Sequence, residues 1–226
     1  MITRLRIEAY PDRLPLLVAD GALAARITGP SRIHLVSTAA TPVGADETVI
    51  EVVVHPGTRL ELTSVAATVV YPGRDGRPSR TTWRLSVADG GGLDLAPQPT
   101  VVAAAARHIG RTEVSLAAGA VVRISERVQI GRLGETGGAW SGTLWADVAG
   151  LPHLRHTVEL GAGAVVAETA LLSVFEFPCT GSPVVSVPPA HGVAVLPLEG
   201  GGTLTTALAG RVADLDGYLA LARPSL

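Results

Sequence analysis

The sequence contains no lysine, because all 18 of its basic residues are arginine. This absence excludes a phosphate-binding loop of the Walker type, a Schiff-base lysine and a lysine general base. The single cysteine, Cys179, excludes an internal disulfide and a cysteine-rich zinc site. No apolar run reaches the roughly 18 residues that span a membrane, and the first residues lack the apolar core of a secretion signal. We therefore expect a cytoplasmic protein without a membrane segment.

Aromatic residues are also scarce, at 4% of the 226 residues, whereas hydrophobic residues make up 47%. The core must therefore consist mainly of valine, leucine and alanine. Charged residues account for 17% and the net charge is −2, which argues against a sequence-independent nucleic-acid groove. Positive mean hydropathy is compatible with an apolar interface or with an ordinary core rich in alanine and valine. Glycine and proline are spread along the chain, so we expect one domain over residues 1–226.

A repeated pattern organises the middle of the chain, in which apolar residues flank a glycine at fixed spacing. Each copy predicts a strand, a tight glycine turn and a second strand, since glycine accepts the positive φ of such turns. The predicted fold is mainly β, with stacked strands whose ends carry the four glycine turns. The copies are Val54-Gly57-Leu60-Leu62, Val87-Gly90-Leu93-Leu95, Leu116-Gly119-Val122-Ile124 and Leu160-Gly163-Val166, the last broken at Glu168.

Three segments are ambiguous or differ from this pattern. Residues 101–109 suit a short helix or an apolar loop, and residues 165–177 suit a strand or a helix. The proline-rich segment 182–198 predicts short edge strands. Apolar residues at helical spacing over 209–222 predict a helix near the C-terminus.

Polar residues offer few catalytic signatures. Each of the six histidines is interpreted as structural or exposed; they are His34, His55, His108, His153, His156 and His191. His153 and His156 are close in sequence, but residues three apart on a strand point to opposite faces and cannot share a metal. The segment Gly138–Gly142 lacks the glycine spacing of a serine nucleophile elbow. Two acids among Asp46, Asp94, Glu126 and Glu135 leave open an acid–base pair, as in a polysaccharide-acting β-solenoid, although such enzymes normally carry a secretion signal.

Glu126 is the acid that the strand pattern singles out. It shares a strand face with Ile124 and Val128, which predicts burial. A buried carboxylate needs a partner or a function, so Glu126 either pairs with an arginine or serves a site. Glu168 raises the same question, because it replaces an apolar residue of the repeat.

An ordered set of short segments resembles the UreD (UreH) family of urease accessory proteins over about residues 40–160. The departures are Ala45, Val69 and Leu95, which stand where the family has glycine, lysine and tryptophan and which bear on partner contacts rather than on the fold. The matching segments are Gly44-Ala45-Asp46, Pro56-Gly57, Leu62-Thr63-Ser64, Ala67 to Tyr71, Leu95-Ala96-Pro97-Gln98 and Gly131 to Glu135.

The resemblance implies a distorted right-handed β-helix with helices toward the C-terminus, and it implies a protein that is not an enzyme. Such a protein would bind apo-urease and a UreF-like accessory protein, which in turn recruits a UreG-like GTPase that carries nickel. It would hold no permanent cofactor but would pass Ni²⁺ along an internal polar path. The residues carried over to this path are Asp46, Thr68, Glu126 and, by a looser alignment, His156; Tyr71, Arg132 and Glu135 lie in the matching segments. A plain β-rich interaction module without a metal role remains the alternative that the sequence does not separate from this one.

Overall fold

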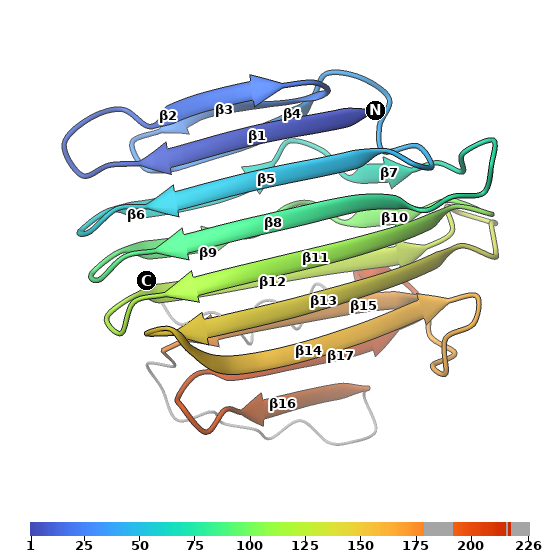
Figure 1. Ribbon diagram of the computed structural model, residues 1–226. Coiled ribbons are helices and arrows are strands. Elements are labelled where there is room, and N and C mark those ends of the chain that lie inside the picture. The colour runs from blue at the N-terminus through green and yellow to red at the C-terminus, as the bar shows by residue number, and fades with distance from the viewer. Residues whose placement is uncertain (179–191, 216, 218–226) are drawn as a thin grey trace.

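The computed structural model describes residues 1–178, 192–215 and 217, and the fold is mainly β (Figure 1). The mainly β prediction is confirmed. The elements are β1 (Ile2–Ala9), β2 (Leu16–Asp20), β3 (Leu23–Gly29), β4 (Arg32–Ser37), β5 (Glu47–Val54), β6 (Arg59–Ser64), β7 (Thr68–Val70), β8 (Ser79–Val87), β9 (Gly92–Leu95), β10 (Thr100–Val102), β11 (Arg107–Leu116), β12 (Val121–Ile130), β13 (Ala139–Val148), β14 (Leu151–Gly161), β15 (Ala170–Phe177), β16 (Val193–Pro197), β17 (Thr203–Ala209) and the 3₁₀ turn η2 (Val212–Leu215).

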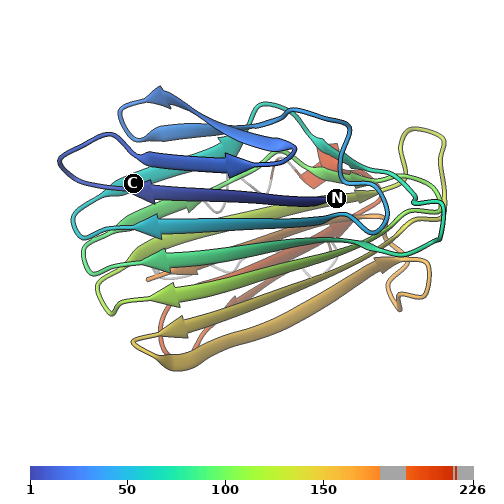
Figure 2. The same cartoon turned by 45° about the horizontal axis from the view of Figure 1, so that its top comes forward.

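Two sheets face each other and enclose the core (Figure 2). The front sheet, nearest the viewer in Figure 1, has the strand order β14-β13-β11-β8-β5-β1-β2. The rear sheet has the order β16-β17-β15-β12-β9-β6-β4-β3, with β10 beside β12 and β7 beside β10. Strands β1, β5, β8, β11 and β13 are parallel neighbours, as are β4, β6, β9 and β12. The chain therefore winds between the sheets in stacked coils, like a β-solenoid.

The apolar residues of successive coils stack on one another inside. Val54 lies beside Val87, which lies beside Leu116, and all three side chains are buried. Leu60, Leu93 and Val122 stack in the same way in the rear sheet. Each copy of the sequence repeat thus supplies one layer to a shared core, because a strand pair alone could not bury its apolar face.

Three of the four predicted glycine turns lie together at one end of the stack. Backbone bonds step from coil to coil there: Ala88 N donates to Val54 O at 3.0 Å and Ala117 N donates to Val87 O at 3.0 Å. The next step, Ala149 N to Leu116 O at 2.8 Å, belongs to the hairpin at Gly150. Gly163 instead follows β14, which runs antiparallel to β13 and ends at the opposite end of the stack. Gly163 thus lies at a strand end, as predicted, but at the other end of the stack from the first three turns, because the chain reverses at Gly150.

The ambiguous segments are also settled within the described residues. Residues 101–109 form the end of β10, a turn and the start of β11, and the later segment forms β15 from residue 170 onward. The segment 192–198 contains the edge strand β16, as predicted, while residues 182–191 lie outside the described residues. The predicted C-terminal helix is corrected in its first half: residue 209 ends β17 and residues 212–215 form the 3₁₀ turn η2, while residues 216 and 218–222 of the prediction lie outside the described residues.

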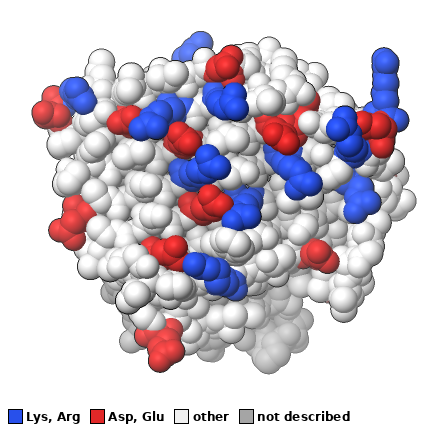
Figure 3. Space-filling model, viewed as in Figure 1, with Lys and Arg blue, Asp and Glu red and all other residues white. Residues whose placement is uncertain are grey.

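The outer face of the front sheet carries alternating charges (Figure 3). Strand register aligns Arg6, Glu51, Arg84 and Glu113 in one row. Glu51 lies 3.3 Å from the guanidinium of each neighbouring arginine, and Arg84 lies 3.4 Å from Glu113. Exposed pairs of this kind contribute about 0–1 kcal/mol each, so the row keeps this face compatible with water more than it stabilises the fold. The described part of the chain contains no helix with the length and apolar character of a membrane span.

Candidate functional site

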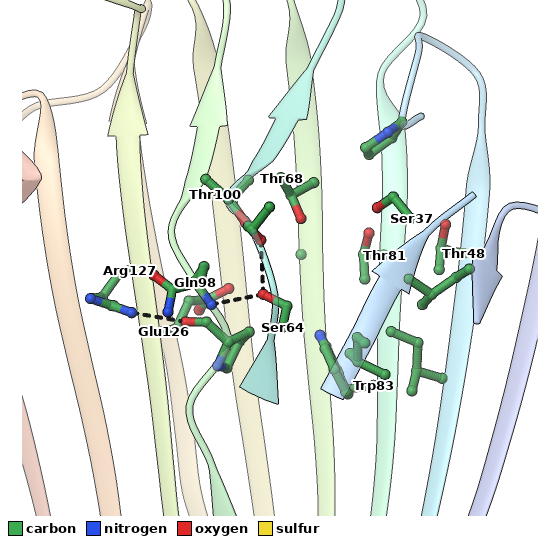
Figure 4. Close-up of a pocket in the computed structure, with 18 of the residues that line it drawn as sticks. Ser37, Thr48, Ser64, Thr68, Thr81, Trp83, Gln98, Thr100, Glu126 and Arg127 are labelled. Carbon is green, nitrogen blue, oxygen red and sulfur yellow. Dashed lines mark hydrogen bonds between the residues drawn. The ribbon is translucent and has the colours of Figure 1, made fainter. Parts of the chain in front are cut away.

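The space between the sheets holds a cavity of about 230 Å³, here called the outer chamber. Its wide end is lined by Val65, Ala66 and Ala67, which are exposed, so the chamber opens to solvent there. Figure 4 shows hydroxyl and amide side chains from both sheets gathered around it. The polar lining includes Ser37, Thr48, Ser64, Thr68, Thr81, Gln98, Thr100, His108 and Thr112.

Strand register explains why a chamber forms near this end of the strands. Thr48, Thr81, Gly110 and Gly142 occupy one inward row of the front sheet. Toward the other end of the same strands the inward residues are larger, as in the row of Val54, Val87 and Leu116. Small polar residues in one row therefore leave space that the adjacent layers fill with apolar side chains.

A second and smaller cavity of about 20 Å³, here called the inner chamber, adjoins the first. The chambers share Thr112, Ile124, Glu126 and Trp140 as lining residues. His156 and Ser173 line only the inner chamber. Glu126 therefore lies at the boundary between the two chambers, and His156 lies beyond that boundary.

Glu126 projects inward from β12, as its alternation with Ile124 and Val128 predicts, and lies opposite Ser173 of β15. Burial raises the pKa of its carboxyl to about 7. Among the described residues, no hydrogen bond or ion pair reaches this carboxylate. The adjacent Arg127 donates from Nη2 to the Pro97 carbonyl at 3.2 Å instead. The arginine-paired alternative for Glu126 is thus absent from the described part of the structure, which leaves a half-buried acid directed at a cavity.

His156 projects inward from β14. Its Nε2 is buried and has no hydrogen-bond partner in the described residues, and burial lowers the pKa of the ring. A neutral imidazole is the form that can bind a metal ion. The opposite-face prediction for His153 and His156 is wrong, because β14 has an irregular register that leaves His153 unpaired. The His153 ring also packs inward, with its centroid 5.2 Å from that of Phe177.

Asp46 lies in the turn before β5 and lines neither chamber. Its carboxylate accepts hydrogen bonds from Val43 N at 2.9 Å, Thr41 Oγ1 at 3.1 Å and the Met1 amine at 2.6 Å. Partial burial acts to raise the pKa of Asp46, but these donors together lower it. Asp46 therefore holds the turn whose Thr41 and Pro42 line the outer chamber. Thr68 lines that chamber directly.

Tyr71, Arg132 and Glu135 form one cluster at the loop that follows β12. The Arg132 side chain and backbone N donate to Glu135, as does the Ala104 backbone N at 3.2 Å. The side-chain bond from Arg132 is the main cause that lowers the pKa of Glu135 to about 2. The Arg132 guanidinium also lies 5.7 Å from the centre of the Tyr71 ring. This cluster closes the loop rather than lining a chamber.

Comparison of the sequence with known proteins identifies its family. The family profile described as UreD urease accessory protein matches residues 13–215. The chain belongs to the UreD urease accessory protein family.

Individual relatives support this membership. The protein named urease accessory protein UreD from Frankia alni is 41% identical over 223 residues, covering 85% of this chain and 74% of the relative. Its counterpart from Frankia casuarinae is 37% identical, covering 88% and 71%. Urease accessory protein UreD 1 from Saccharopolyspora erythraea is 33% identical, covering 85% and 78%. The predicted family resemblance is confirmed over most of the chain.

The acids of this UreD family member do not form a hydrolytic pair. Asp94 lies 3.6 Å from Arg123 beside a separate cavity that the rear-sheet strands line, Glu126 lies between the sheets, and Glu135 closes a loop. Neither chamber nor this third cavity is lined by two of the four acids that the sequence analysis singled out.

Sequence reasoning missed several lining residues. Thr112 could have been found from its alternation with Val114 and Leu116, which are buried on the same face of β11. The same alternation places His108 on that face of β11. His108 is buried, its Nδ1 lies 2.9 Å from Ser79 Oγ, and burial lowers its pKa to about 4. The position of the His108 and Trp140 rings relative to each other depends on strand register between coils.

The chambers can supply oxygen and nitrogen donors to a divalent ion, but only a few at a time. The described residues contain no cluster of three or more His, Cys, Asp or Glu side chains able to hold a metal ion. One carboxylate and one imidazole would bind a transition ion weakly enough to release it. This donor set suits passage of an ion better than permanent storage.

Proposed function

We propose that this UreD family protein is a scaffold of urease maturation that passes Ni²⁺ to apo-urease through its interior. In this proposal it binds a UreF-like accessory protein, and through it a UreG-like GTPase delivers the nickel. The protein itself makes and breaks no covalent bond. The observation that carries the proposal is the position of Glu126, a half-buried acid that lines both of two adjoining chambers.

The chemistry of the chambers supports an ion as the cargo. Hydroxyl groups such as those of Thr68, Thr81 and Thr100 can accept hydrogen bonds from the bound waters of an ion in the outer chamber. Glu126 supplies a negative charge where solvent is scarce, and His156 supplies an imidazole nitrogen, which suits nickel. Nickel is the substrate of this route and not a resident cofactor.

The test of the route is nickel delivery in a reconstituted mixture of this protein, UreF, UreG and apo-urease. Glu126→Gln keeps the shape of the side chain but removes its charge, and His156→Gln removes the imidazole. Both variants should lower the nickel content of urease while the complex still assembles. Glu113→Gln is the matched control, because Glu113 lies on the exposed face of the neighbouring sheet beside Arg84. Normal nickel content with both Glu126→Gln and His156→Gln would refute the route.

The scaffold role has its own test. The protein should co-purify with UreF, and urease should join this pair in size-exclusion chromatography. A stable interface buries about 800 Å² of surface on each partner. A complex with such an interface should survive the dilution that occurs on the column. A protein that remains monomeric and ignores UreF would refute the scaffold role, whatever the nickel result.

A further inference from the structure

The outer chamber is large enough for a hydrated metal ion, whereas the inner chamber is not. A divalent ion with six bound waters needs roughly 180 Å³, taking about 30 Å³ for each water. The outer chamber, at about 230 Å³, can hold such an ion with its water shell. The inner chamber, at about 20 Å³, has room for only one water-sized sphere. An ion that passes from one to the other must therefore lose its shell at the boundary.

At the boundary, the Trp140 side chain packs against two glycines, Gly142 and Gly110. Trp140 projects inward from β13 and is only 3% exposed. Its indole covers Gly142, where an added methyl group would overlap the ring. A methyl group on Gly110 would lie 3.4 Å from Glu126 Oε1 and 3.6 Å from Trp140 Nε1. Gly110 thus leaves the gap between the carboxylate and the indole, and any larger residue there narrows it.

We propose that Trp140, Gly110 and Glu126 form a dehydration constriction, which admits only ions that exchange bound water for carboxylate and imidazole donors and so favours Ni²⁺ over Mg²⁺. The inference rests on the proposed nickel route and adds the step that makes the route selective. Water molecules leave the ion toward the outer chamber as Glu126 and then His156 take their places. No covalent bond changes in this exchange.

The selectivity follows from the chemistry of the two ions. Mg²⁺ loses its waters reluctantly, demands octahedral oxygen donors and usually keeps several waters when bound. Ni²⁺ stands higher in the order of affinity for nitrogen donors, so an imidazole beyond the constriction repays its lost water better. The indole wall prevents an ion from carrying its shell past Glu126, and the imidazole then decides which ion is stabilised beyond it.

Two substitutions change the constriction in opposite directions. Gly110→Ala adds a methyl group beside Glu126 and the indole without a backbone clash, and so narrows the gap. Trp140→Phe removes part of the wall and widens it. Gly29→Ala is the matched control, since it adds a methyl group 3.4 Å from Arg32 Cβ at the edge strand β3, away from both chambers.

The measurement is the rate at which nickel appears in urease, determined as metal content in the reconstituted complex with and without excess Mg²⁺. Gly110→Ala should slow delivery by at least about tenfold, because the added methyl group narrows the gap through which the ion passes. Wild-type delivery should be insensitive to Mg²⁺, whereas delivery by Trp140→Phe should fall as Mg²⁺ enters the inner chamber and competes. Melting curves show whether each variant folds.

The outcomes separate this inference from the proposed function. If Glu126→Gln lowers nickel delivery but Gly110→Ala and Trp140→Phe both behave like Gly29→Ala, the constriction is overturned and the route stands. If Glu126→Gln and His156→Gln leave delivery normal, the route itself fails. Should Gly110→Ala melt at a lower temperature, Trp140→Phe decides: acquired sensitivity to Mg²⁺ supports the constriction, and unchanged insensitivity overturns it.

Discussion

Replacement of Glu126 by glutamine should stabilise the protein at alkaline pH. Burial raises the pKa of this carboxyl from its ordinary value of 4.5 to about 7 in the folded state. The unfolded chain therefore ionises at lower pH than the folded chain, and ionisation favours unfolding. The cost is absent below pH 4.5, grows between 4.5 and 7, and is complete above 7. The difference between the two pKa values corresponds to about 3 kcal/mol.

The assay is urea denaturation of the wild type and of Glu126→Gln at pH 4.5 and pH 8, with a chelator present to remove metal ions. At pH 8 the variant should be more stable by up to about 3 kcal/mol, and at pH 4.5 the two proteins should be nearly equal. Glu113→Gln controls for the substitution and should show no gain at pH 8, because Glu113 is exposed and paired with arginines.

Two results would refute this reasoning. A variant less stable than the wild type by about 3–5 kcal/mol at pH 8 would mean that Glu126 belongs to a buried ion pair. Equal stability at both pH values would mean that water in the outer chamber hydrates the carboxylate as well as bulk solvent does. Either result would remove the half-buried and unpaired acid on which the proposed route depends.

Three further predictions concern the surroundings of the chambers. Glu135→Ala should lower the melting temperature at pH 7, and the difference should shrink as pH falls from 4.5 toward 2, because the depressed pKa of Glu135 stabilises the fold only while the acid is ionised. Gly142→Ala should cost about 1–3 kcal/mol in urea denaturation, since the methyl group displaces the Trp140 indole; an unchanged midpoint would show that the ring moves freely. Asp46→Asn should lower thermal stability modestly but leave nickel delivery to urease normal, because Asp46 holds a turn and lines neither chamber.

Local patterns in the sequence were enough to predict the strand and turn units. Alternation over a few residues decides which side chains of a strand share a face, so the inward position of Glu126 followed from Ile124 and Val128. Glycine turns are equally local, because a positive φ depends on one residue and its neighbours. Gly57 and Gly90 do adopt φ values of 68° and 67°. The ordered short segments identified the family for the same reason, since they are read along the chain.

The tertiary structure alone decided which of these units meet. The break of the fourth repeat at Glu168 was visible, but the reversal at Gly150 that carries Gly163 to the opposite end was not. That reversal turns β14 back along β13 and brings His156 to the inner chamber that Glu126 also lines. The irregular register of β14 at His153 likewise made the prediction from simple alternation wrong, because that prediction placed His153 and His156 on opposite faces.

Site geometry could not be predicted because it depends on pairings between strands far apart in sequence. The chambers exist where Thr48, Thr81, Gly110 and Gly142 fall into one row, and that row is set by the register of four parallel strands. A shift of one residue in any strand would turn its inward side chains outward. Sequence periodicity fixes the faces of each strand by itself, whereas the packing energy of the whole stack selects the register that aligns them.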